Sequence, residues 1–153
     1  MNRLIDSFIG LLARLPYPPI ALLGRLSVGL VFWNSGRSKV DGWNIFQVSD
    51  KTLFLFSDEY RLFRLFGKQE LWTMPPWTAA LAAQIAEHVL GALLIAGLAS
   101  RFSALGLFIM TLIIEVFVYP QAYVMHGTWA AILLMLVKFG PGALSLDHLI
   151  RRR

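Results

Sequence analysis

Hydrophobic residues are gathered in four long runs along the chain, separated by short polar or proline-containing breaks. The runs cover residues 20–40, 77–98, 102–119 and 122–140. A helix of about 20 residues rises about 30 Å, which matches the hydrocarbon core of a bilayer. The pattern therefore predicts four membrane-spanning helices. The break at residues 99–101 is so short that the second and third helices should be antiparallel neighbours.

Three further segments differ from these runs. Residues 1–17 place apolar side chains on one helical side, interrupted by charges, and predict an amphipathic helix in the membrane interface. Residues 41–76 mix charged residues with many aromatic rings and predict a periplasmic or interfacial loop with short helices. Residues 143–153 predict a short interfacial helix that ends in arginines. The predicted fold is one all-α membrane domain, an antiparallel four-helix bundle.

Composition supports membrane insertion and excludes some functions. The chain is 57% hydrophobic and only 15% charged, whereas soluble domains carry about a quarter charged residues. Its net charge of +5 comes from basic residues at segment ends, which suits an anionic lipid surface and argues against nucleic acid as a partner. Cysteine is absent, so disulfides, thiolate metal sites and thiol redox chemistry by this chain are excluded.

The distribution of basic residues predicts the orientation. Four spans place both termini and the turn near residue 101 on one side, which holds Arg3, Arg14, Arg101 and the three terminal arginines. The long loop balances its cations with acids, and the loop at residues 121–127 has none. Both termini should therefore be cytoplasmic, although Arg37 and Lys39 on the other side count against this.

A polar stripe interrupts the second run within residues 83–91 (AQIAEHVLG). On a helix Gln84, Glu87, His88 and Gly91 fall within one arc of about 100°. A carboxylate at membrane depth is energetically expensive. The stripe should therefore face other protein segments and find a cationic or hydrogen-bonding partner there.

The first and third runs supply candidates for that partner. Arg25 and Lys39 share one face of the first run with Gly29, Phe32 and Gly36. Arg25 is either the counter-ion of Glu87 or a side chain that extends to the membrane surface. The candidate buried site comprises Arg25, Glu87, His88 and Glu115, with Lys39, Gln84 and His126 as secondary candidates.

Three interpretations of these residues remain open. In the first, the polar network is structural, and Arg25 neutralises Glu87 or Glu115. In the second, the site binds a quinone, and Glu and His side chains accept and donate its protons. In the third, His88, His126, Met125 and the two glutamates bind a metal such as copper. Glu87 and His88 diverge by about 100° and chelate poorly, so no metal ligand is assigned. The chain has no phosphate loop, H-E-x-x-H motif or nucleophile elbow, so no catalytic residue is assigned and no complete reaction is expected of it alone.

Several stretches resemble the DoxX family of small four-helix proteins of bacterial inner membranes. They are RLSVGLVFWNSGRSK, Glu87 and Gly91 followed by the turn GLASR, and the closing GPGALSLDHLI. The resemblance covers residues 21–150, and TLFLFSDEY with VYPQAYVMHGTWAAILL resembles a subgroup with a long first loop.

The resemblance implies an accessory membrane subunit of a redox, oxidative-stress or thiol-stress system. Its partners would be the lipid bilayer and other membrane, periplasmic or cytoplasmic proteins, and at most it would serve a quinone-linked oxidoreductase. The alternative is a membrane component that handles or transports copper-related peptides or small molecules, with a structural polar core. Transport through four helices would require a homo-oligomer.

Overall fold

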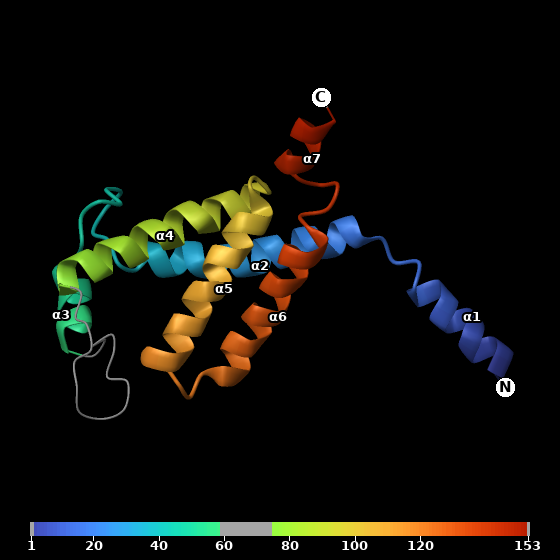
Figure 1. Ribbon diagram of the computed structural model, residues 1–153, viewed down its shortest axis with the longest axis horizontal. Coiled ribbons are helices and arrows are strands. Elements are labelled where there is room, and N and C mark those ends of the chain that lie inside the picture. The colour runs from blue at the N-terminus through green and yellow to red at the C-terminus, as the bar shows by residue number, and fades with distance from the viewer. Residues whose placement is uncertain (1, 59–74, 153) are drawn as a thin grey trace.

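The computed structural model describes residues 2–58 and 75–152, which form seven helices and no strand (Figure 1). The helices are α1 (Asn2–Leu12), α2 (Tyr17–Arg37), α3 (Asp50–Asp58), α4 (Pro76–Ala96), α5 (Ser100–Phe117), α6 (Tyr123–Phe139) and α7 (Leu146–Arg151). The expected all-helical class is confirmed. Within the long loop, α3 is described, whereas Tyr60, Phe63, Phe66 and Trp72 lie outside the described residues.

Length and hydropathy identify fewer spans than the four expected. In the described ranges, α4 and α5 are each long and apolar enough to cross a bilayer. The helices α1 and α2 meet the criterion only as a pair, which is bent by 57° at the break between them. Because α2 carries Arg25 and Arg37, its own hydropathy is low, and α6 is apolar but only 17 residues long.

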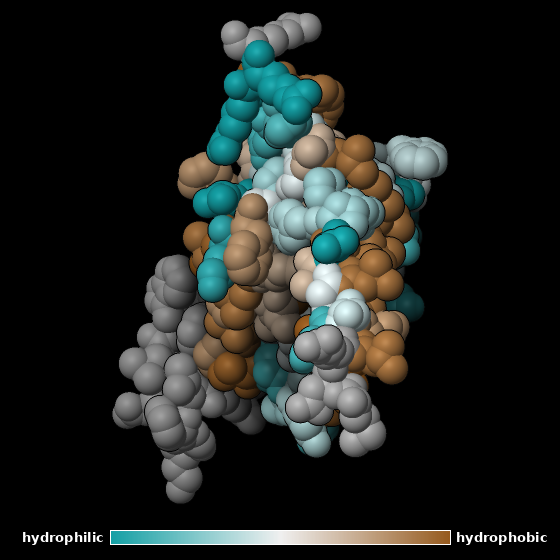
Figure 2. All heavy atoms as spheres, turned by 90° about the vertical axis from the view of Figure 1, so that its right-hand side faces the viewer, coloured by the Kyte–Doolittle hydropathy of each residue, from teal (hydrophilic) through white to brown (hydrophobic). Residues whose placement is uncertain are grey.

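The helices α2, α4, α5 and α6 pack in a ring. Helix α2 contacts α4 and α6, and α5 contacts the same two helices (Figure 1). Antiparallel packing of α2 on α6 brings Phe32 and Trp129 edge to face, with ring centroids 5.8 Å apart. Hydrophobic side chains cover the flanks of the helices, whereas hydrophilic ones gather over the C-terminal α7 (Figure 2).

Glycines allow α2 and α4 to approach closely. A Cβ atom added to Gly91 would lie 3.2 Å from the carbonyl oxygen of Gly29, and one added to Gly36 would lie 2.6 Å from Nδ1 of His88. Small residues at such a seam let the helix backbones come together. Gln84, Glu87, His88 and Gly91 are all buried along this seam.

The C-terminal segment is tied to the turn between α4 and α5. The carboxylate of Asp147 accepts hydrogen bonds from the backbone N–H groups of Ala99 (2.8 Å) and Ser100 (2.9 Å). The N–H of Asp147 donates to the carbonyl of Gly97 at 2.9 Å. A carboxylate at this position satisfies unpaired N–H groups at the start of α5 and complements its helix dipole.

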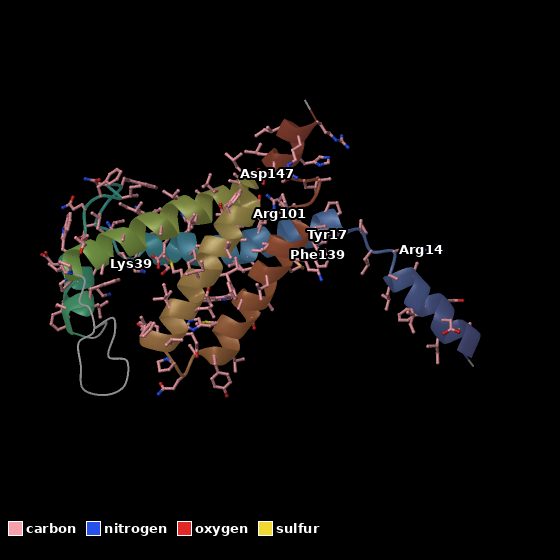
Figure 3. All side chains as sticks on the ribbon, viewed as in Figure 1. Arg14, Tyr17, Lys39, Arg101, Phe139 and Asp147 are labelled. Atoms are coloured by element: carbon pink, nitrogen blue, oxygen red, sulfur yellow. The ribbon has the colours of Figure 1, made fainter. Side chains whose placement is uncertain are left out.

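Two side chains of α2 contact the same end of the bundle. The guanidinium of Arg25 is buried and donates to the carbonyls of Leu144 and Ile95. The hydroxyl of Tyr17 donates to the carbonyl of Gly140 at 2.6 Å. We call these contacts of Tyr17, Arg25 and Asp147 the C-terminal clamp. Lys39 lies at the other end of the bundle (Figure 3).

Substituting Gly97 by Ala should disrupt the C-terminal clamp. Gly97 has φ +73°, and its added Cβ would lie 2.0 Å from Nη1 of Arg25 and 2.6 Å from Cβ of Ser145. We expect a loss of about 1 to 3 kcal/mol of unfolding free energy, measured by thermal unfolding in mild detergent. Gly127→Ala in α6 is the matched control, because nothing lies within 4 Å of its Cβ. Equal behaviour of the two variants would contradict this account.

Asp147→Ala should lower stability by about 1 to 2 kcal/mol at neutral pH, since the start of α5 loses its cap. Burial raises the pKa of the Asp147 carboxyl, but hydrogen bonds from Ser100 and Ala99 more than offset this, so the net pKa is lowered. The stabilisation should be complete above about pH 5 and disappear as pH falls below about 4. Unfolding temperatures across pH should therefore converge for wild type and variant at acid pH. Asp6→Ala, an exposed position on α1, should show no such trend.

Candidate functional site

The buried carboxylate of α4 is paired with a lysine just beyond the end of α2. Nζ of Lys39 lies 2.9 Å from Oε1 and 2.8 Å from Oε2 of Glu87, and the hydroxyl of Ser35 donates to Oε1 at 3.1 Å. Nζ also donates to Oγ of Ser35 at 2.9 Å. The Glu87 side chain is 3% exposed and that of Lys39 is 18% exposed. Such a buried carboxylate needs both the charge and the hydrogen bonds.

Arg25 is therefore not the counter-ion of Glu87. Its side chain is also buried, so it does not extend to the surface of the bundle. Its guanidinium is held by the carbonyls of Leu144 and Ile95 at the opposite end of α2. Lys39 and Arg25 are separated by about 20 Å along the helix axis. Because α4 runs antiparallel to α2, Glu87 meets the end of α2 that carries Lys39.

His88 and Gln84 fill the seam between α2 and α4. Nδ1 of His88 hydrogen-bonds to the carbonyl of Gln84 at 2.7 Å, and its ring meets Trp33 edge to face at 5.2 Å. Nε2 of Gln84 donates to the carbonyl of Ile45 at 3.0 Å. Both residues are buried, and neither lines the cavity described below. The contact of Gln84 with Ile45 positions the loop after α2 against α4.

A second carboxylate, Glu115 of α5, pairs with a histidine of α6. Nδ1 of His126 lies 2.5 Å from Oε2 of Glu115. The histidine side chain is only 4% exposed, whereas that of Glu115 is 23% exposed. Glu115 thus reaches a histidine rather than Arg25, and His126 belongs to the site although the sequence suggested it only as a secondary candidate.

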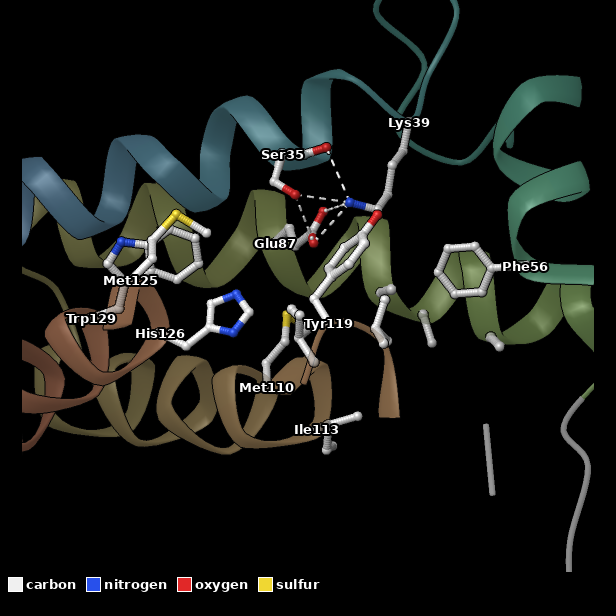
Figure 4. Close-up of a pocket in the computed structure, with 15 residues that line it drawn as sticks. Ser35, Lys39, Phe56, Glu87, Met110, Ile113, Tyr119, Met125, His126 and Trp129 are labelled. Atoms are coloured by element: carbon white, nitrogen blue, oxygen red, sulfur yellow. Dashed lines mark hydrogen bonds and ion pairs between the residues drawn. The ribbon is translucent and has the colours of Figure 1, made fainter. Parts of the chain in front are cut away.

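Lys39 and Glu87 of the first pair and His126 of the second line a cavity of about 400 Å³ (Figure 4). Lys39, Glu87 and Ser35 lie on one side of it, and His126 lies on the other. The remaining lining residues are hydrophobic or aromatic: Phe56, Ala79, Ala82, Ala83, Met110, Ile113, Ile114, Val118, Tyr119, Met125 and Trp129. Periodicity shows which helix faces are buried, but no sequence signal shows where three helices leave a gap. The cavity itself was therefore not predicted.

Metal-ligating groups do not cluster in the described residues. No group of three or more His, Cys, Asp or Glu side chains in residues 2–58 and 75–152 is arranged to hold a metal ion. The described site therefore offers two separate acid–base pairs and an apolar cavity between them.

Comparison with known protein families identifies the chain. The model of the DoxX family matches residues 20–120, which is more than half of the sequence. The chain belongs to the DoxX family. No curated protein and no solved structure matched it.

The matched region of this DoxX protein holds only part of the cavity. It contains Lys39 and Glu87, whereas His126 and Trp129 of α6 lie beyond residue 120. The cavity therefore joins residues of the family-matched region to residues of a helix outside it.

Replacing Lys39 by Met should destabilise this DoxX protein by about 2 kcal/mol or more, because Glu87 stays buried without its counter-ion. Adding Glu87→Gln should restore much of the loss, since the amide is neutral and still accepts a hydrogen bond from Ser35. Thermal unfolding in mild detergent measures both effects. Lys51→Met is the control, because Lys51 is exposed on α3. A double variant no more stable than Lys39→Met would contradict the pairing.

Proposed function

We propose that this DoxX protein is the membrane subunit of a redox or stress-response system and binds a quinone in its cavity. The observation that carries the proposal is an apolar cavity of about 400 Å³ with hydrogen-bonding groups on two sides. Small-molecule sites are typically mostly apolar, with volumes of about 300 to 1,000 Å³ and a few polar groups that set orientation. A quinone headgroup is a flat ring with oxygens at both ends, and it fits that pattern.

The cavity walls supply the contacts that such a ring requires. The ammonium of Lys39, held by Ser35 and Glu87, places a positive charge beside one ring oxygen. His126 is the polar group for the other oxygen. Trp129 and Tyr119 offer aromatic surface against which a flat ring can pack.

Electrons must come from, or go to, another protein. The chain has no cysteine, and the described residues form no metal cluster of His, Cys, Asp and Glu. This DoxX protein would therefore bind the quinone and manage its protons, while a membrane, periplasmic or cytoplasmic partner carries the redox centre.

The ring packing of α2, α4, α5 and α6 supports four membrane-spanning helices. Since α4 and α5 are each long and apolar enough to span, their antiparallel neighbours α2 and α6 would cross beside them. The end that carries the C-terminal clamp also carries Arg101, Lys138, Arg151 and Arg152. By the positive-inside rule this end would face the cytoplasm of a bacterial inner membrane, with both termini. The cavity would then lie in the periplasmic half.

Purification in mild detergent followed by solvent extraction and mass spectrometry tests the proposal. We expect a quinone to co-purify with the wild-type protein. Ala83→Phe should reduce the bound quinone at least about fivefold, because Ala83 lines the cavity and the larger ring fills it. Ala92→Phe is the matched control on an exposed position of the same helix.

Three results would contradict quinone binding. They are a folded protein without quinone, equal quinone content in the two variants, and failure of the empty protein to take up added quinone. Elemental analysis of the same sample tests the copper alternative. A protein without quinone or metal, in which Glu87 substitutions lower only stability, would make the polar core structural.

A further inference from the structure

We propose that Glu115 and His126 form a proton-exchanging pair that distinguishes the oxidised from the reduced form of the ligand in the cavity. This inference rests on the proposed quinone site and assigns its proton chemistry to one pair of residues. It concerns the proton alone, and the electrons belong to the partner protein.

The geometry leaves one nitrogen of His126 for a ligand. Nδ1 is engaged by Oε2 of Glu115 at 2.5 Å, and the ring lines the cavity (Figure 4). Among the described residues, Glu115 is the hydrogen-bond partner of this ring, through Nδ1. A carboxylate behind an imidazole fixes the ring orientation and determines which nitrogen faces the reacting group.

The pair can hold two different numbers of protons, and each state suits a different ligand. With the additional proton, the imidazolium donates from Nδ1 to Glu115 and from Nε2 to a carbonyl oxygen, as a quinone provides. Without it, Nδ1–H still donates to Glu115, and Nε2 accepts from a hydroxyl, as a quinol provides. Oxidation of a quinol by the partner would pass two electrons to that protein and release two protons, of which one would bind Nε2 and the other, from the second hydroxyl, would pass to water.

The difference in exposure between His126 and Glu115 favours release of that proton through Glu115. The His126 side chain is 4% exposed, whereas the Glu115 side chain is 23% exposed on the far side of the ring. A proton accepted at Nε2 makes the imidazolium, and the proton on Nδ1 can then pass to Glu115. The described contacts thus form a short path from the cavity toward the surface.

Other titratable groups also face the cavity, and the experiment must distinguish their contribution from that of the His126–Glu115 pair. They are Lys39 at the end of α2, Glu87 of α4 and Tyr119 of α5. Lys39 and Glu87 form a closed ion pair with Ser35. A substitution at His126 leaves all three in place and therefore isolates the contribution of the pair.

The test compares decylubiquinone with decylubiquinol, kept reduced under anaerobic conditions, as ligands of the full-length protein in nanodiscs. The ratio of quinol to quinone affinity should rise about tenfold or more between about pH 5.5 and about pH 8.5. In His126→Gln the ratio should stay constant, since the amide does not titrate. His148→Gln, which alters a histidine of α7 outside the cavity, should behave as the wild type.

A second measurement needs no variant. In weakly buffered solutions across the same pH range, binding of the quinone should take up protons where the pair is deprotonated, and binding of the quinol should release protons where it is protonated, as followed with an indicator dye. A pH-independent ratio in the wild type, an unchanged rise in His126→Gln, or binding without proton exchange would each overturn the pair while leaving quinone binding intact. Failure of both forms to bind would overturn the proposed function and the pair together.

Discussion

The arrangement of this protein depends on satisfying buried charges within a membrane bundle. A charge buried among apolar helices is tolerated only with a partner, so each one constrains the register of the helices around it. Lys39 and Glu87 align one end of the α2–α4 seam, and Arg25 with the carbonyl of Ile95 aligns the other. Sliding α2 by one turn would separate both contacts at once. The glycines of the seam allow the close approach that these short contacts require.

Much of the fold follows from hydrophobic periodicity, because an apolar run between prolines or glycines leaves the chain few alternatives to a helix. The burial of Gln84, Glu87 and His88 likewise follows from their shared face. The pairing of Arg25 with Glu87 failed for a physical reason. A single sequence shows which residues share a helix face but not how two helices are aligned along their axes. Only the antiparallel register of α2 and α4 determines that Lys39, and not Arg25, reaches the carboxylate.

The cavity could not be predicted from the sequence either, because residues of several helices line it. Its polar walls come from α4, α6 and the end of α2, and its apolar walls include a phenylalanine of α3. No spacing within one helix reports such a gap. His126 lies in the first turn of α6, at the boundary between the loop and the fourth hydrophobic run, and its partner Glu115 is on the preceding helix. The sequence identified the four residues of the two acid–base pairs as candidates, but it did not show which residue pairs with which.

The C-terminal clamp also has a consequence for the order of assembly during synthesis. Arg25 belongs to the second helix to emerge, yet one of its two carbonyl acceptors is on Leu144, and the cap of α5 is Asp147. Until residues 144–147 have been made, the guanidinium and the start of α5 lack these partners. The bundle can therefore reach its final register only after residues 144–147 have been synthesised, so α2 and α4 are made before the contacts that complete their packing.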